Sequence, residues 1–156
     1  MNTILRFLEV FALGTWLGGI VLLSFAVAPG AFATLGSRTE AGALVGLVLG
    51  RLHVFGVIAG IVYLVAALAL GRSLAALVRP AALAVILMVA LTAASQWGVT
   101  SRMAALRAQM GSVDRTPVES PLRVEFDRLH KISVRLEGSV LLLGLVALFL
   151  TVRNPS

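Results

Sequence analysis

The chain has 156 residues, of which 59% are hydrophobic and 13% charged, and its mean hydropathy is +1.00. A soluble domain of this length cannot bury so much apolar surface, so a soluble globular protein is excluded and lipid is the expected solvent. The formal net charge of +6 does not indicate a nucleic-acid partner, because most basic residues flank apolar runs and no basic tail accompanies them. The chain has no cysteine, which excludes disulfides and thiolate metal sites.

The first apolar run predicts a membrane span over residues 7–35. Its start resembles a signal peptide, with an A-x-A-like sequence at 31–33. However, the apolar stretch 10–27 is longer than a signal core and follows Glu9, so we expect it to be retained as a span. Pro29 lacks a backbone donor and is expected to kink or end this helix.

The second apolar stretch, 41–70, is longer than the roughly 20 residues that a span needs. Arg51 and His53 interrupt it. We therefore predict the span itself over 52–70, with 41–50 as a helical extension or a segment at the membrane interface.

A proline opens the third span, predicted over 80–99, and a polar helical extension follows over 101–110. Glycine, serine, aspartate and proline predict a loop over 111–122. The last helix carries several charges before its apolar part, so its span is predicted over 133–152.

The whole chain, residues 1–156, is thus predicted to be one all-α domain. We expect an integral membrane four-helix bundle whose third and fourth helices extend beyond the bilayer. Its partners would be the lipid bilayer and either further copies of itself or a larger membrane complex.

Both histidines occur in the same local pattern, Arg51-Leu52-His53 and Arg128-Leu129-His130. The two tripeptides open alternate spans, which indicates a faint internal repeat. Because these helices run in the same direction, we expect His53 and His130 at similar depth. Imidazole nitrogens ligate haem iron and divalent metals, so the pair is a candidate haem or metal site.

Glycines line the face of the second helix that carries His53, at steps of three and four residues. These glycines are Gly42, Gly46, Gly50, Gly56 and Gly60. Small residues allow a neighbouring helix or a flat cofactor to approach closely. Gly14 and Gly18 of the first span are expected to meet this stripe, and plain helix packing is the simpler explanation.

Glu137 follows His130 by seven residues and therefore lies on the same helical face, about two turns away. A carboxylate in a span is costly, so we expect it to face the bundle and pair with another helix, unless it lies in water at the interface. It joins the two histidines as a third candidate ligand. Residues that could line the site are Trp16, Arg51, Arg128 and Ser133, although core packing is the simpler role for Trp16.

Two stretches carry a family resemblance. They are Trp16-Leu17-Gly18-Gly19 followed by Ala28-Pro29 and Phe32, and Phe126-Asp127-Arg128-Leu129-His130-Lys131-Ile132-Ser133. With four spans, they resemble the bacterial family DUF4149, which is similar to the eukaryotic transmembrane protein 205. The resemblance implies a four-helix, multi-pass protein of the bacterial inner membrane with no established activity. The tolerance to platinum drugs associated with the eukaryotic relatives implies handling of metal or small molecules. The family keeps a serine two positions after a Leu-His pair, and Ser133 stands one position further.

Three functions follow as hypotheses. The first is an accessory subunit that presents its helix faces to a membrane partner. The second is permeation of a small molecule or metal ion through an oligomer, and the third is haem or metal binding by His53 and His130. No nucleophile–base pair is visible, so an enzyme is not expected.

Overall fold

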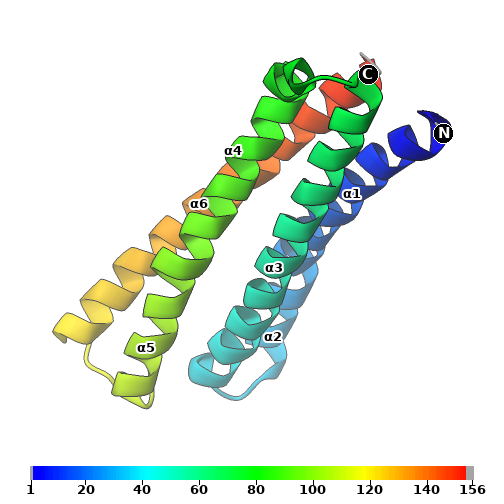
Figure 1. Ribbon diagram of the computed structural model, residues 1–156. Helices are drawn as coiled ribbons and strands as arrows, with labels where there is room; N and C mark the ends of the chain where they lie inside the picture. Colours follow the sequence, from blue (N-terminus) through cyan, green and yellow to red (C-terminus); the bar gives the residue numbers. More distant parts are fainter. Residues whose placement is uncertain (1, 154–156) are drawn as a thin grey trace.

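The computed structural model describes residues 2–153, which form one bundle of long helices without strands (Figure 1). The first helical stretch comprises α1 (Asn2–Leu22), the π-helical η1 (Leu23–Val27) and α2 (Ala28–Thr34). The second is α3 (Arg38–Gly71), followed by the short 3₁₀ helix η2 (Leu74–Val78). The third comprises α4 (Pro80–Ala94), the π-helical η3 (Ser95–Thr100) and α5 (Ser101–Met110), and the fourth is α6 (Pro121–Arg153).

The all-α prediction is confirmed. Each of the four stretches contains an 18-residue window with a mean hydropathy between 1.8 and 2.5 and is long enough to cross a bilayer. The protein is therefore an integral, multi-pass membrane protein.

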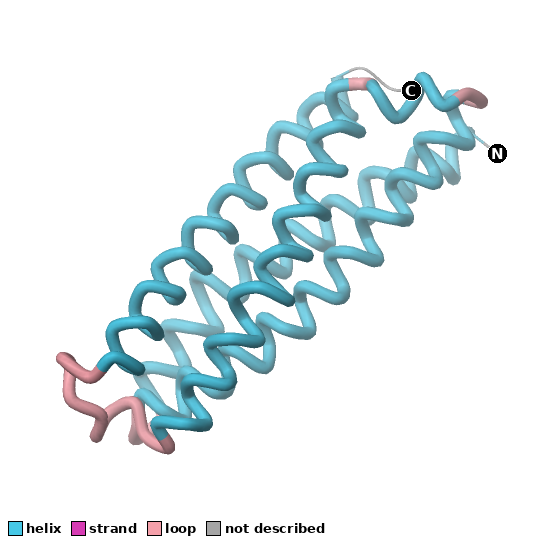
Figure 2. The backbone as a smooth tube through the Cα atoms, turned by 60° about the vertical axis from the view of Figure 1, so that its left-hand side comes forward, coloured by secondary structure: helices cyan, strands magenta, loops and turns pink. Residues whose placement is uncertain are grey.

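The helices pack as two hairpins side by side (Figures 1 and 2). Helix α1 packs against α3 and α4 against α6, while the α1–α6 and α3–α4 contacts join the hairpins. Both chain ends and η2 lie at one end of the bundle, and the α2–α3 turn and the α5–α6 loop lie at the other. This second end carries the candidate site.

Helix α3 is continuous from Arg38, so the segment 41–50 is a helical extension of the span. The helix begins where the Ser37 side chain accepts a hydrogen bond from the Glu40 backbone N–H (3.0 Å). Arg51 does not interrupt it, and its side chain is exposed on the outside of the bundle.

Pro29 does not end the first helical stretch, which continues to Thr34. The turn before it widens into the π-helical η1, where the Ala28 N–H donates to the Leu23 carbonyl. The wider turn makes room for the proline ring and tolerates the backbone hydrogen bond that proline cannot donate.

Trp16 forms the centre of the apolar core and is 1% exposed. Its indole fills the space left by the glycines of α3: a Cβ added at Gly56 would overlap the ring, and one at Gly60 would crowd it. The simpler prediction, core packing against small residues, is therefore confirmed for these positions.

The expectation that Gly14 and Gly18 meet the glycine stripe is wrong. Both lie on the exposed face of α1, and a Cβ added at either would have nothing within 4 Å. The inward face of α1 is set instead by bulky residues at helical spacing, namely Leu13, Trp16, Leu17 and Ile20.

Candidate functional site

A buried histidine joins the two hairpins. His53 on α3 is 2% exposed, and its Nδ1–H donates to Oε1 of Gln96 in η3 (2.8 Å). Its Nε2 is hydrogen-bonded to Oε2 of Glu137 on α6 (3.2 Å). Three helical stretches thus meet in one polar triad inside an apolar bundle.

The hydrogen bonds of the triad limit the forms that His53 and Glu137 can take. Because a carbonyl oxygen can only accept, Nδ1 of His53 carries a proton, and one further proton lies between Nε2 and the Glu137 carboxyl group. The pair is therefore either imidazolium with carboxylate or neutral imidazole with carboxylic acid. Both forms satisfy the buried groups, which the apolar surroundings require.

The two histidines are not brought together, and the expectation of similar depth is wrong. His53 stands fifteen residues after the start of α3, whereas His130 stands nine residues after the start of α6. At 1.5 Å per residue this separates their depths by about 9 Å. Glu137, sixteen residues into α6, is the group that reaches the level of His53. His130 is exposed.

A ligand role for His53 would require a rearrangement, since both ring nitrogens are already hydrogen-bonded. Among residues 2–153, no group of three or more histidine or carboxylate side chains is spaced to hold a metal ion.

A cleft of about 960 Å³ lies between the α2–α3 pair and the α5–α6 pair. Figure 1 shows these pairs diverging toward the end of the bundle that holds the loops. Apolar residues of the lining include Ile20, Leu23, Phe25, Leu47, Val134 and Leu141. Charged and polar residues of the lining include Arg38, Arg107, Arg123, Asp127, His130, Ser133 and Glu137. The cleft is amphipathic, and Glu137 of the triad forms part of its wall.

The lip of the cleft is apolar and exposed. Phe25, Leu47 and Val134 line it while remaining 74%, 54% and 59% exposed. Phe25 and Val134 belong to helical stretches that are long and apolar enough to cross a bilayer.

Arg107 of α5 is held in the cleft by packing. Its guanidinium carbon lies 5.5 Å from the centre of the Phe126 ring. It also lies close to α3, where a Cβ added at Gly46 would approach Nη1 to 3.3 Å and one at Gly42 would approach Nη2 to 3.4 Å. At Gly42 and Gly46, the flat group that the glycine stripe accommodates is thus this side chain.

The other predicted lining residues divide into two groups. Ser133 is buried in the cleft wall. Gly50, which belongs to the glycine stripe, lies next to the triad, since a Cβ added there would be 3.8 Å from the Gln96 amide. Arg51 and Arg128 are exposed and do not line the cleft, and Arg128 instead donates two hydrogen bonds to Glu125 (both 3.0 Å). An arginine two residues before a histidine in the sequence is therefore not a sufficient signal for a residue that lines the site.

Gln96 and Arg107 were missed as site residues. Their signal in the sequence is helical spacing: Gln96, Thr100, Met103 and Arg107 follow one another at steps of three and four. Such a line of polar and flexible residues indicates a face that is turned toward the interior rather than toward lipid.

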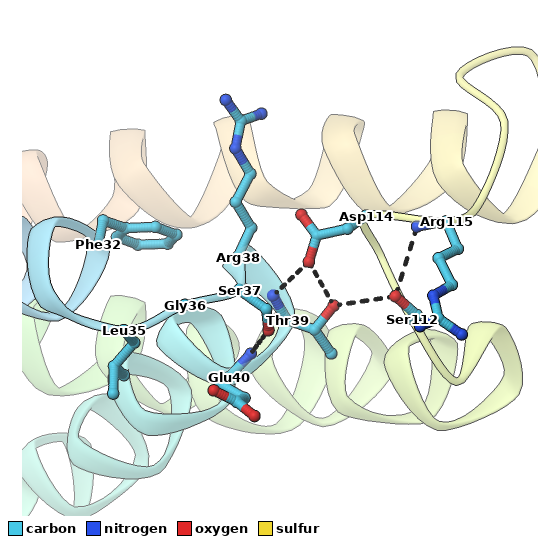
Figure 3. A pocket seen from close by; sticks show the side chains of 10 residues that line it. All are labelled: Phe32, Leu35, Gly36, Ser37, Arg38, Thr39, Glu40, Ser112, Asp114 and Arg115. Atoms are coloured by element: carbon cyan, nitrogen blue, oxygen red, sulfur yellow. Dashed lines mark hydrogen bonds between the residues drawn. The ribbon is translucent and has the colours of Figure 1, made fainter.

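The loops below the cleft are tied together by Asp114 (Figure 3). Its Oδ2 accepts hydrogen bonds from the Thr39 backbone N–H (3.1 Å) and hydroxyl (3.0 Å), while the Thr39 hydroxyl accepts one from the Val113 N–H (3.0 Å). The bond from the Thr39 N–H, with further support from the Thr39 hydroxyl and Arg38, lowers the pKa of the Asp114 carboxyl. We call this set of bonds the Thr39–Asp114 clasp.

Fold and cleft together define a class, that of small four-helix integral membrane proteins with an amphipathic cleft based on a buried polar triad. The chain belongs to the family described as Domain of unknown function (DUF4149), which it matches over residues 11–112. The matched range includes the Trp16 stretch and ends before 126–133. No curated protein and no solved structure matches the chain.

Proposed function

We propose that the protein binds a small amphipathic molecule that enters the cleft from the bilayer, in the inner membrane of a bacterium. Of the three functions expected from the sequence, permeation of a small molecule through an oligomer is the nearest, and the present proposal is binding rather than passage. The role is one of binding rather than catalysis.

The observation that carries the proposal is the cleft itself. Its volume of about 960 Å³ lies within the roughly 300–1,000 Å³ that is typical of small-molecule sites. Such sites combine apolar walls with a few convergent polar groups, and this one has an apolar lip, a fixed guanidinium and the Glu137 carboxyl group.

The experiment fills the cleft. Gly138 lines it and a Cβ added there would have nothing within 4 Å, so the side chain of Gly138→Leu is expected to take up cleft volume. Gly14→Leu is the matched control, because Gly14 is equally open but lies outside the cleft.

The probe is dodecylphosphocholine, added below its micellar concentration to protein in a maltoside detergent, with bound copies counted by native mass spectrometry. We expect binding to the native protein and to Gly14→Leu, and a loss of about tenfold or more in Gly138→Leu. Equal binding by all three proteins would contradict the proposal.

An interaction with a membrane partner is a second candidate, favoured by the open glycines of α1. Gly14 and Gly18 leave a flat helix face toward lipid, the geometry that close helix–helix contacts use. The test is chemical cross-linking in native membranes. A cross-linked species that Gly14→Leu removes and Gly138→Leu retains is expected, and its absence from the native protein would contradict this candidate.

A further inference from the structure

The charges that line the cleft are unevenly compensated. Asp127 accepts two hydrogen bonds from Arg123 (3.0 and 3.1 Å), and Glu137 is bonded to His53. Both carboxylates of the lining are thereby engaged. Arg107 has no carboxylate within 4 Å among the residues that the structure describes.

The Arg107 guanidinium is also fixed in place. It lies over the Phe126 ring and close to α3 at Gly42 and Gly46. Its Nε is buried without a hydrogen-bond partner. A cation that is held by packing and lacks a counter-ion is preorganised to receive an anion, since little rotamer freedom is left to lose.

Arg107 lies at one end of the cleft, and the apolar part of the lining lies toward the other. Arg107 lies near the end of α5, three residues before Met110, at the end of the bundle that carries the loops. The apolar lining residues Ile20, Leu23 and Leu141 come from the spans. The cleft thus has a cationic end near the membrane surface and an apolar end within the spans.

From this arrangement we infer that the ligand is an anionic membrane amphiphile, and that Arg107 binds its phosphate or carboxylate headgroup while the acyl or alkyl chain lies against the apolar wall. Guanidinium groups bind such oxyanions through paired hydrogen bonds. The inference rests on the proposed function, to which it adds the chemical class of the ligand and the residue that selects it.

The test compares two probes that share a twelve-carbon chain, dodecyl phosphate and the zwitterionic dodecylphosphocholine, in the same native mass spectrometry assay. We expect the native protein to prefer dodecyl phosphate. Arg107→Gln is expected to weaken dodecyl phosphate binding about tenfold or more, because a charge-assisted contact is lost. Binding of dodecylphosphocholine, whose single phosphate charge is balanced by its own choline group, should weaken less, and the binding that remains shows that the variant is folded.

Arg102→Gln is the matched control. Arg102 belongs to the same helix, but it is 64% exposed, pairs with Glu125 (3.3 Å) and does not line the cleft. The control removes the same charge from α5 and should leave the preference for dodecyl phosphate intact. Arg107→Lys keeps the charge and should retain part of that preference.

The outcomes separate this inference from the proposed function. If both probes bind equally and Arg107→Gln affects neither selectively, the anionic ligand is excluded while the cleft remains a binding site. If Gly138→Leu affects neither probe, the proposed function fails. If inorganic phosphate binds as tightly as dodecyl phosphate, the site takes a free anion and the amphiphile is overturned.

Discussion

A single imidazole on α3 links the second, third and fourth helical stretches of the bundle. His53 uses both ring nitrogens, one for Gln96 and one for Glu137, so its removal leaves two polar groups unpaired inside the bundle. An unpaired buried hydrogen-bonding group costs about 1–3 kcal/mol. The triad therefore matters for stability whatever the ligand of the cleft is.

His53→Ala is accordingly expected to lower the free energy of unfolding by about 2 kcal/mol or more, from the unpaired partners and the lost packing. The measurement is reversible thermal or denaturant unfolding in detergent. His130→Ala is the control, because His130 is exposed and its loss should change stability little. Equal stabilities for the two variants would rule out the role assigned to His53.

Residue types alone identified His53 and Glu137 as candidates but not as partners. The pairing follows from the depth at which each residue stands, and that depth depends on where α3 and α6 begin. Arg38 and Pro121 mark those starts, and the matching tripeptides alone say nothing about the distance from them. Gln96 could not be assigned to the site from the sequence by itself, because a single amide in a span does not show which face of the helix points inward. Its neighbours at helical spacing are needed for that.

At the scale of the helix, α1 and α3 pack closely because the Trp16 ring lies against two glycines of α3, Gly56 and Gly60. The Trp16 indole lies where the Cβ atom of Gly56 would be, and a Cβ added at Gly60 would overlap Val89 and crowd the indole. A tryptophan with glycines at helical spacing on a neighbouring span predicts such a contact. The sequence could not show that Gly14 and Gly18 lie outside it, because a stripe of small residues fits either face of an otherwise apolar helix.

This contact gives two opposite expectations for the same substitution. Gly56→Ala should destabilise the protein by about 1–3 kcal/mol, because the added methyl group forces Trp16 out of place. Gly14→Ala should stabilise it by up to about 1 kcal/mol, because alanine favours the helix and meets nothing there. Both are measured by unfolding in the same detergent. A stabilising Gly56→Ala would mean that Trp16 does not occupy this space.

At the scale of the molecule, the Thr39–Asp114 clasp joins the two hairpins at the end where the cleft opens. Its carboxylate also lies at the first turn of α3, where the helix dipole favours negative charge. The pKa of Asp114 in the folded protein is lowered below its usual value of 3.8. The clasp should therefore respond to acid.

The direction of that response follows from linkage. A carboxyl group whose pKa is lower in the folded state adds stability above its unfolded pKa and loses it as pH falls through its folded pKa. We expect the native protein to be more stable than Asp114→Asn at neutral pH, and the difference to shrink on acidification below about pH 4. Melting temperatures between pH 7 and pH 3 test this.

Glu119→Gln removes an exposed carboxylate from the same loop and serves as the control. A difference between native protein and Asp114→Asn that stays constant across this pH range would show that the carboxylate charge is not what stabilises the clasp.

The exposed, apolar lip of the cleft determines how affinity for this protein should be expressed. A ligand that reaches Phe25 and Val134 from the bilayer never needs to dissolve in water. Occupancy then depends on the mole fraction of the ligand in the membrane. Each additional methylene group improves partitioning into lipid by about 0.8 kcal/mol, so an apparent affinity for dissolved ligand rises with chain length even if no contact in the cleft changes. Ligands of different chain length can be ranked for this protein only per molecule of lipid.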